Sequence, residues 1–132
     1  MTSAPLLSVQ ALTCRYGEQL ALDQVSMTLN AGEIHGVTGV PGAGMSTLIK
    51  AIMMLVAPQA GRVLIRGMPN ALASSRSHIA YLPEIIRPPG HLSGHDFITM
   101  TCTVRSGSKG DIDGLAGDLD LDPGLLAHPI RR

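Results

Sequence analysis

The run GVPGAGMST at residues 39–47 contains the residue types that hold phosphate groups in proteins. Glycines let backbone N–H groups face phosphate oxygens, and a hydroxyl at the end of such a loop binds Mg²⁺. The full pattern GxxxxGK[ST] also contains a lysine, which brings positive charge to the β- and γ-phosphates. Met45 stands at the lysine position. The run therefore predicts a phosphate-binding loop that lacks its cation.

The segments on either side of the loop have the patterns that would position it. Residues 33–38 (EIHGVT) form a short, mostly apolar run that predicts a buried strand, and residues 46–56 (STLIKAIMMLV) place apolar side chains at helical spacing. The helix would then begin at the phosphates, where free N–H groups and the helix dipole favour anions. An ordinary turn between a strand and a helix is the alternative.

Residues 6–67 resemble the nucleotide-binding domain of ATP-binding cassette (ABC) transporters. The family loop GPNGAGKST shares Gly39, Gly42, Ala43, Gly44, Ser46 and Thr47 with this chain. Upstream, the family's opening is matched at Tyr16, Gly17, Ala21, Leu22, Val25, Ser26, Leu29, Gly32, Glu33, Ile34, Gly36 and Gly39. Residues 57–67 resemble the family's hairpin after the loop helix, and residues 79–84 (IAYLPE) resemble the strand leading into its Q-loop.

The resemblance implies an α/β fold of the P-loop NTPase class, of the ABC ATPase type. The expected parts are an N-terminal antiparallel β subdomain, the P-loop strand and helix, and the start of a helical subdomain, so that the fold is incomplete. We expect residues 1–105 to form the N-terminal part of the nucleotide-binding domain and residues 106–114 (SGSKGDIDG) to form a flexible connector. Residues 115–132 would begin the helical subdomain, truncated before the family's signature motif.

The resemblance also implies ATP and Mg²⁺ as cofactors. Tyr16 is expected to stack on adenine, a contact that contributes roughly 1–3 kcal/mol per base in nucleic-acid binders. The nucleotide phosphates would lie on Gly39, Gly42, Ala43, Gly44, Met45, Ser46 and Thr47. Mg²⁺ would be held by Ser46 and by Glu84, which replaces the family's Q-loop glutamine and offers a hard oxygen ligand. The alternative for Tyr16 is that it only ends a strand. The alternative for Glu84 is that it is a solvated acid in a loop.

Replacing the loop lysine by Met45 predicts weaker nucleotide binding, by roughly tenfold to a hundredfold, because a hydrogen bond to a charged partner is lost. Phosphoryl transfer depends almost wholly on positioning and electrostatics, so hydrolysis would suffer more. The family's Walker B aspartate, catalytic glutamate and signature motif would all lie beyond residue 132. We therefore assign no catalytic residue and leave open whether the chain is an enzyme. We expect no ATP hydrolysis from the chain alone.

Composition is compatible with one small domain of 132 residues with zero formal net charge. The absence of a basic stripe argues against nucleic acid as a partner. The resemblance implies a transmembrane subunit of a transporter and a second ABC ATPase subunit, in a homo- or heterodimer, as partners. It also implies a cytoplasmic location, peripheral on the inner face of the cell membrane. The string YLPE at residues 81–84 suggests the ABC-2 exporter type.

Other patterns are better explained by structure than by chemistry. Cys14 and Cys102 are far apart in the sequence and are expected to be reduced thiols. The run DLDLDPG at residues 118–124 has the alternating aspartates of a calcium loop but lacks the glycine of its sharp turn. We expect Asp122 instead to cap a helix with Pro123 in its first position. Another helix is expected to begin near His95, after Ser93.

The function that the sequence favours is that of an ATP-binding subunit, present as a fragment, that binds Mg·ATP through an altered Walker A loop and couples the nucleotide to membrane transport. The alternative is a non-catalytic or decayed ABC-type protein that acts, if at all, as a docking partner of a transporter. An unrelated P-loop kinase or GTPase fits less well, because it would lack the upstream tyrosine and the downstream IAYLPE run.

Overall fold

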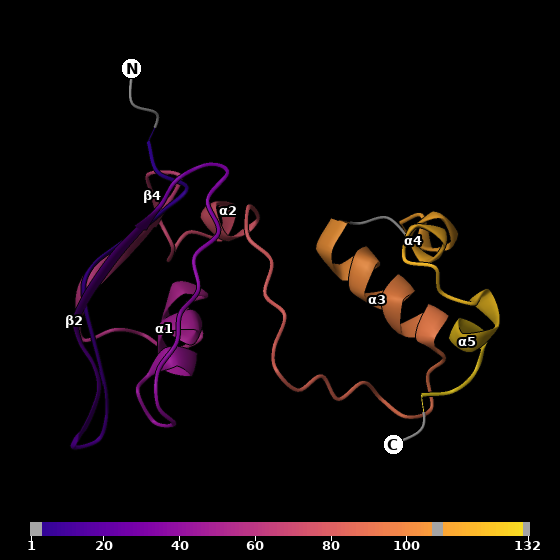
Figure 1. Cartoon of the computed structure of the whole chain (residues 1–132), viewed down its shortest axis with the longest axis horizontal. Coiled ribbons are helices and arrows are strands. Elements are labelled where there is room, and N and C mark those ends of the chain that lie inside the picture. Colours follow the sequence, from indigo (N-terminus) through magenta and orange to yellow (C-terminus); the bar gives the residue numbers. More distant parts are fainter. Residues whose placement is uncertain (1–3, 107–109, 131–132) are drawn as a thin grey trace. The chain divides into compact units, whose positions relative to one another are not determined.

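The computed structural model describes residues 4–106 and 110–130, which divide into two compact units between Leu82 and Pro83 (Figure 1). The first unit holds a sheet and two helices, and the second holds three helices. In the first unit the elements are β1 (Leu7–Tyr16), β2 (Gln19–Leu29), α1 (Met45–Ile52), β3 (Ala60–Ile65), β4 (Met68–Pro69) and α2 (Ala73–Arg76). In the second they are α3 (Gly94–Ser106), α4 (Ile112–Asp118) and α5 (Pro123–Ala127).

The sheet is antiparallel, with strand order β2-β1-β3-β4. In β1, Val9, Leu12 and Cys14 are buried, a spacing that departs from simple alternation between Val9 and Leu12. The register with β2 shifts at that point, and Ala11 adopts a φ of 46°. An extra residue in one strand moves the following side chains to the other face. The irregularity therefore brings Leu12 and Cys14 onto the same buried face as Val9.

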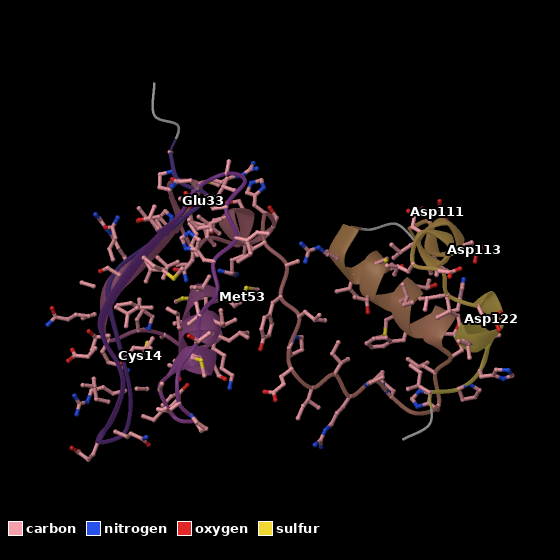
Figure 2. All side chains as sticks on the ribbon, viewed as in Figure 1. Cys14, Glu33, Met53, Asp111, Asp113 and Asp122 are labelled. Atoms are coloured by element: carbon pink, nitrogen blue, oxygen red, sulfur yellow. The ribbon has the colours of Figure 1, made fainter. Side chains whose placement is uncertain are left out.

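The core of the first unit lies between the sheet and α1, which runs beside the sheet in Figure 1. From the helix, Leu48, Ala51 and Ile52 pack in the same cluster as the buried residues of β1. Cys14, labelled in Figure 2, belongs to this cluster, and burial raises the pKa of its thiol. The thiol therefore stays protonated and packs as a small apolar group.

Helix α1 is shorter than the sequence predicts. The apolar spacing continues to residue 56, but the helix ends at Ile52 and Leu55 is 63% exposed. The buried side chain of Asn70 donates from Nδ2 to the carbonyl oxygens of Ala51 (2.9 Å) and Ile52 (3.0 Å). These hydrogen bonds satisfy carbonyls that the next helical turn would otherwise use. The helix end is thus fixed by a residue from another segment.

Residues 33–38 do not form the predicted strand. They have no regular secondary structure, and all of them are exposed, with Ile34 at 98%. A parallel strand needs a neighbour for its backbone hydrogen bonds, and the strands described here are all engaged in the antiparallel sheet. The same holds for the predicted strand in residues 79–84, which is also irregular. The apolar run predicted the first strand and the family resemblance implied the second, but no described strand pairs with either.

The hairpin predicted in residues 57–67 is present. Strands β3 and β4 pair through Ile65 and Met68, and the two turn residues Arg66 and Gly67 have φ values of 50° and 78°. Positive φ at both central positions is the pattern of a type I′ turn, which matches the twist of the flanking strands. The hairpin also carries Asn70 to the end of α1.

In the second unit each helix begins at a side-chain cap, and the caps of α3 and α5 lie where the sequence predicts them. The Ser93 hydroxyl donates to the Asp96 carboxylate (2.6 Å) and accepts from the Asp96 backbone N–H (3.1 Å), at the start of α3. Asp122 accepts from the backbone N–H of Gly124, and α5 begins at Pro123, as expected. Asp111 caps α4 in the same way, through the N–H of Gly114 (Figure 2).

The predicted domain limits at residues 105 and 114 remain predictions. Of the predicted connector, residues 107–109 lie outside the described residues, and residues 112–114 belong to α4. Among the residues that the structure describes, none of the helices is long and apolar enough to cross a bilayer.

Candidate nucleotide site

A pocket of about 240 Å³ opens between the end of the β1–β2 hairpin and the start of α1. It is lined by two groups of residues that are distant in the sequence. The hairpin contributes Tyr16, Gln19 and Ala21, and the loop and first helical turn contribute Gly42, Ala43, Gly44, Met45, Ser46 and Thr47. The structure therefore brings the predicted adenine platform and most of the predicted phosphate loop to one pocket.

The loop depends on glycine at two positions that face the pocket. Gly42 and Gly44 have φ values of 88° and 90°, in the left-handed region that side chains disfavour. A Cβ atom on Gly44 would collide with the carbonyl oxygen of Ala21 and lie 2.9 Å from Leu22 Cδ2. Strand β2 thus holds the loop so closely that only glycine fits at residue 44.

The first turn of α1 supplies hydrogen-bond donors. Gly44 is the N-cap residue and makes no side-chain cap, while its carbonyl accepts the first helical hydrogen bond from Leu48 (2.8 Å). The N–H groups before Leu48 have no partner within the helix, and they carry the positive end of its dipole. Such a helix start can bind an anion. Ser46 is exposed in this turn, so its hydroxyl is accessible.

Met45 lies at the same helix start and carries no charge. A Cβ atom built on Gly39 would lie 3.7 Å from Met45 Sδ and 3.8 Å from its Cγ. The thioether therefore folds back against the beginning of the loop. Gly39 itself is not among the residues that line the pocket, and it lies against the Met45 side chain.

Tyr16 and Gln19 face the loop from the hairpin end. They are paired directly across the two strands, so their side chains lie on one face of the sheet. Tyr16 is 49% exposed, which leaves its ring accessible. Gln19 was not among the site residues predicted from the sequence. The signal was present, because a two-residue turn after Tyr16 places residue 19 opposite it.

Glu84, the predicted second magnesium ligand, belongs to the other compact unit and is exposed. Its role as a ligand remains a prediction. Among the described residues, no group of three or more His, Cys, Asp or Glu side chains is placed to hold a metal ion.

The irregular segment before the loop begins with a local polar cluster at Glu33, which Figure 2 labels. The Glu33 carboxylate accepts from the Asn30 side-chain amide (3.0 Å) and backbone N–H (2.7 Å), and these bonds lower the pKa of Glu33. His35 Nε2 lies 3.2 Å from the same carboxylate. These contacts fix the turn after β2, and none of these residues lines the pocket.

Comparisons with known proteins identify the class. Residues 22–118 match the family described as ABC transporter. The arabinose import ATP-binding protein AraG 2 of Burkholderia cenocepacia (strain HI2424) is 39% identical over 88 residues, which cover 67% of this chain and 17% of the relative. The manganese transport system ATP-binding protein MntB of Listeria innocua is 37% identical over 78 residues, covering 59% of this chain and 32% of the relative.

Solved structures agree. A structure described as the ATP binding subunit of an ABC transporter superposes with a TM-score of 0.70 at 30% identity, covering 78% of this chain and 44% of that one. A putative ABC transporter ATP-binding protein from Pyrococcus furiosus gives a TM-score of 0.74 at 25% identity, covering 86% and 55%.

The chain belongs to the ABC transporter family, and it has part of the ABC ATPase fold. The predicted family and fold class are thereby confirmed. The chain spans about a sixth to a third of the length of the two curated relatives described above. The exporter subtype remains a prediction, since the relative with the higher identity is named for import.

Proposed function

We propose that this chain binds an adenine nucleotide, as Mg·ATP, in the pocket between the hairpin and the altered loop. The observation that carries the proposal is the convergence of Tyr16 with residues 42–47 on one pocket. Tyr16 would stack on the base, and the N–H groups of the loop and first helical turn would bind the phosphates. The chain would act as an ATP-binding subunit that couples the nucleotide to membrane transport.

The residues present fit a Mg²⁺-bound polyphosphate in shape, although they lack the usual cation. The close approach of the Gly44 backbone to β2 forms the cradle, and Ser46 offers an exposed hydroxyl. Ser46 would bind the metal together with the nucleotide's own oxygens, since Mg²⁺ is commonly held by few protein ligands plus phosphates. Glu84 is proposed as a further ligand from its position in the Q-loop-like run. When bound, Mg²⁺ would neutralise phosphate charge.

Partners and location follow from the family rather than from the pocket. We propose that the chain pairs with a transmembrane transporter subunit and with a second ABC ATPase subunit. It would then lie at the inner face of the cell membrane. The names of the relatives, which are ATP-binding proteins of import and transport systems, support this proposal. They give no support to the alternative of a docking protein without a nucleotide.

Isothermal titration of the full chain with Mg·ATP tests the proposal. Binding in the micromolar to millimolar range is expected, together with a loss of roughly fivefold to a hundredfold for Tyr16→Ala, from the worth of a stacking contact. Tyr81→Ala is the matched control, because Tyr81 is the other tyrosine of the first unit and does not line this pocket. The proposal is wrong if the wild-type chain shows no heat of binding at millimolar Mg·ATP.

A further inference from the structure

The pocket between the hairpin and the loop contains no charged side chain among the residues that the structure describes. Its polar side chains are those of Tyr16, Gln19, Ser46 and Thr47, all neutral. The hydrogen-bond donors that remain for phosphates are therefore hydroxyls, one amide and the backbone N–H groups of the loop. Every additional negative charge on a bound phosphate chain would enter without a side-chain counter-charge.

The position of Met45 determines which phosphate is affected. In a loop of this type, backbone N–H groups hold the α- and β-phosphates, while the lysine reaches the β- and γ-phosphates. Here the thioether of Met45 lies against Gly39, at 3.7 Å from where a Cβ of that residue would be. It adds apolar surface at the start of the loop and no donor. The backbone contacts to the α- and β-phosphates would thus be retained, whereas the lysine's contacts to the β- and γ-phosphates would be missing, and the γ-phosphate would have no other side-chain cation.

We infer that this site does not discriminate between adenosine diphosphate and adenosine triphosphate. It would bind either nucleotide through the adenine base and the α- and β-phosphates, which both contain. The inference rests on the proposed nucleotide binding and specifies its ligand class. Stacking on Tyr16 and the N–H groups of residues 42–47 serve both nucleotides equally, because they touch groups that both contain. The γ-phosphate would be stabilised only by Mg²⁺ and by Ser46. Its additional negative charge would have no side-chain counter-charge in the pocket, which offsets that stabilisation.

The test is isothermal titration of the full chain with Mg·ADP and Mg·ATP under the same salt conditions. The two dissociation constants of the wild-type chain are expected to agree within about threefold, less than the effect of one net hydrogen bond. Met45→Lys should change the ratio in favour of ATP by about tenfold or more, because it restores a charged donor at the γ-phosphate. Met45→Leu, of similar size and also uncharged, should retain the wild-type ratio.

The outcomes separate the inference from the proposed function. If neither nucleotide binds at millimolar concentration, the proposed function fails and the inference with it. If both bind but the wild-type chain prefers ATP by about tenfold or more, only the inference is overturned. A ratio that Met45→Lys leaves unchanged, in a variant whose circular dichroism matches wild type, also overturns it. Because the wild-type ratio needs no variant, a failure of Met45→Lys to fold leaves the inference testable.

Discussion

Asn70 is the residue through which the β3–β4 hairpin fixes the end of the loop helix, and replacing it gives a sharp test of the packing. Asn70→Ala removes two hydrogen bonds, from Nδ2 to the carbonyl oxygens of Ala51 at 2.9 Å and Ile52 at 3.0 Å. At a net 0.5–1.5 kcal/mol each, the loss is about 1–3 kcal/mol in the free energy of unfolding. The Met54 backbone N–H still donates to the Ala51 carbonyl (3.1 Å), so the Ile52 carbonyl is the one that would be left without its described partner, and a loss near the middle of this range is expected.

The assay is urea unfolding of the full chain followed by far-ultraviolet circular dichroism, with hydrogen exchange of the α1 amides as a local readout. Asn70→Asp is the matched variant, because it keeps the shape of the side chain and removes both N–H donors. It should cost at least as much as Asn70→Ala. Asn70→Ala values below about 0.5 kcal/mol, the range of ordinary surface substitutions, with unchanged exchange in α1, would refute the role assigned to this side chain.

Three further outcomes are expected. Gly44→Ala should destabilise the first unit by about 1–3 kcal/mol or more in thermal or urea unfolding, because residue 44 has a φ of 90° and the added methyl would collide with the Ala21 carbonyl oxygen. An unchanged unfolding midpoint would contradict this close contact between the loop and β2. Leu12→Ala should cost about 2–5 kcal/mol in the same assay, since Leu12 is fully buried, and a smaller loss would mean that the core collapses around the gap. Hydrogen bonds from Ser93 lower the pKa of Asp96. The stability that this cap gives to α3 is therefore fully present at pH values above the ordinary carboxyl pKa, and it is lost as the pH falls through the lower pKa of the folded state. Ser93→Ala should raise the pKa of Asp96 toward its ordinary value in a chemical-shift titration, with part of the lowering kept because the backbone N–H of residue 93 still donates to the carboxylate. A titration identical to wild type would argue against the cap.

Local sequence signals predicted the parts of the fold that are held together by nearby residues. The hairpin at residues 57–67, which the family resemblance implied, is present, and its turn is formed locally by Arg66 and Gly67. The caps at Ser93 and Asp122 are confirmed, and each uses a side chain two or three residues from its partner. Interactions of this range are encoded in short patterns and need no knowledge of the rest of the chain.

Features set by distant residues were not predictable in this way. The end of α1 at Ile52 depends on Asn70, a residue of another segment. The irregularity of β1 at Ala11 follows from the pairing of β1 with two other strands. In each case the local pattern was compatible with several outcomes, and tertiary contacts selected one.

The irregular residues 33–38 show the same rule at the entrance to the loop. Their apolar composition is that of a buried strand, yet a strand becomes stable only when another strand satisfies its backbone groups. The loop that follows is nevertheless ordered against β2, because Gly44 packs on Ala21 and α1 packs on the sheet. The geometry of the candidate phosphate site in this chain therefore depends on the antiparallel sheet and on α1 rather than on the segment that leads into it. Substitutions at Gly44 should accordingly alter the pocket more than substitutions at Ile34, whose side chain is 98% exposed.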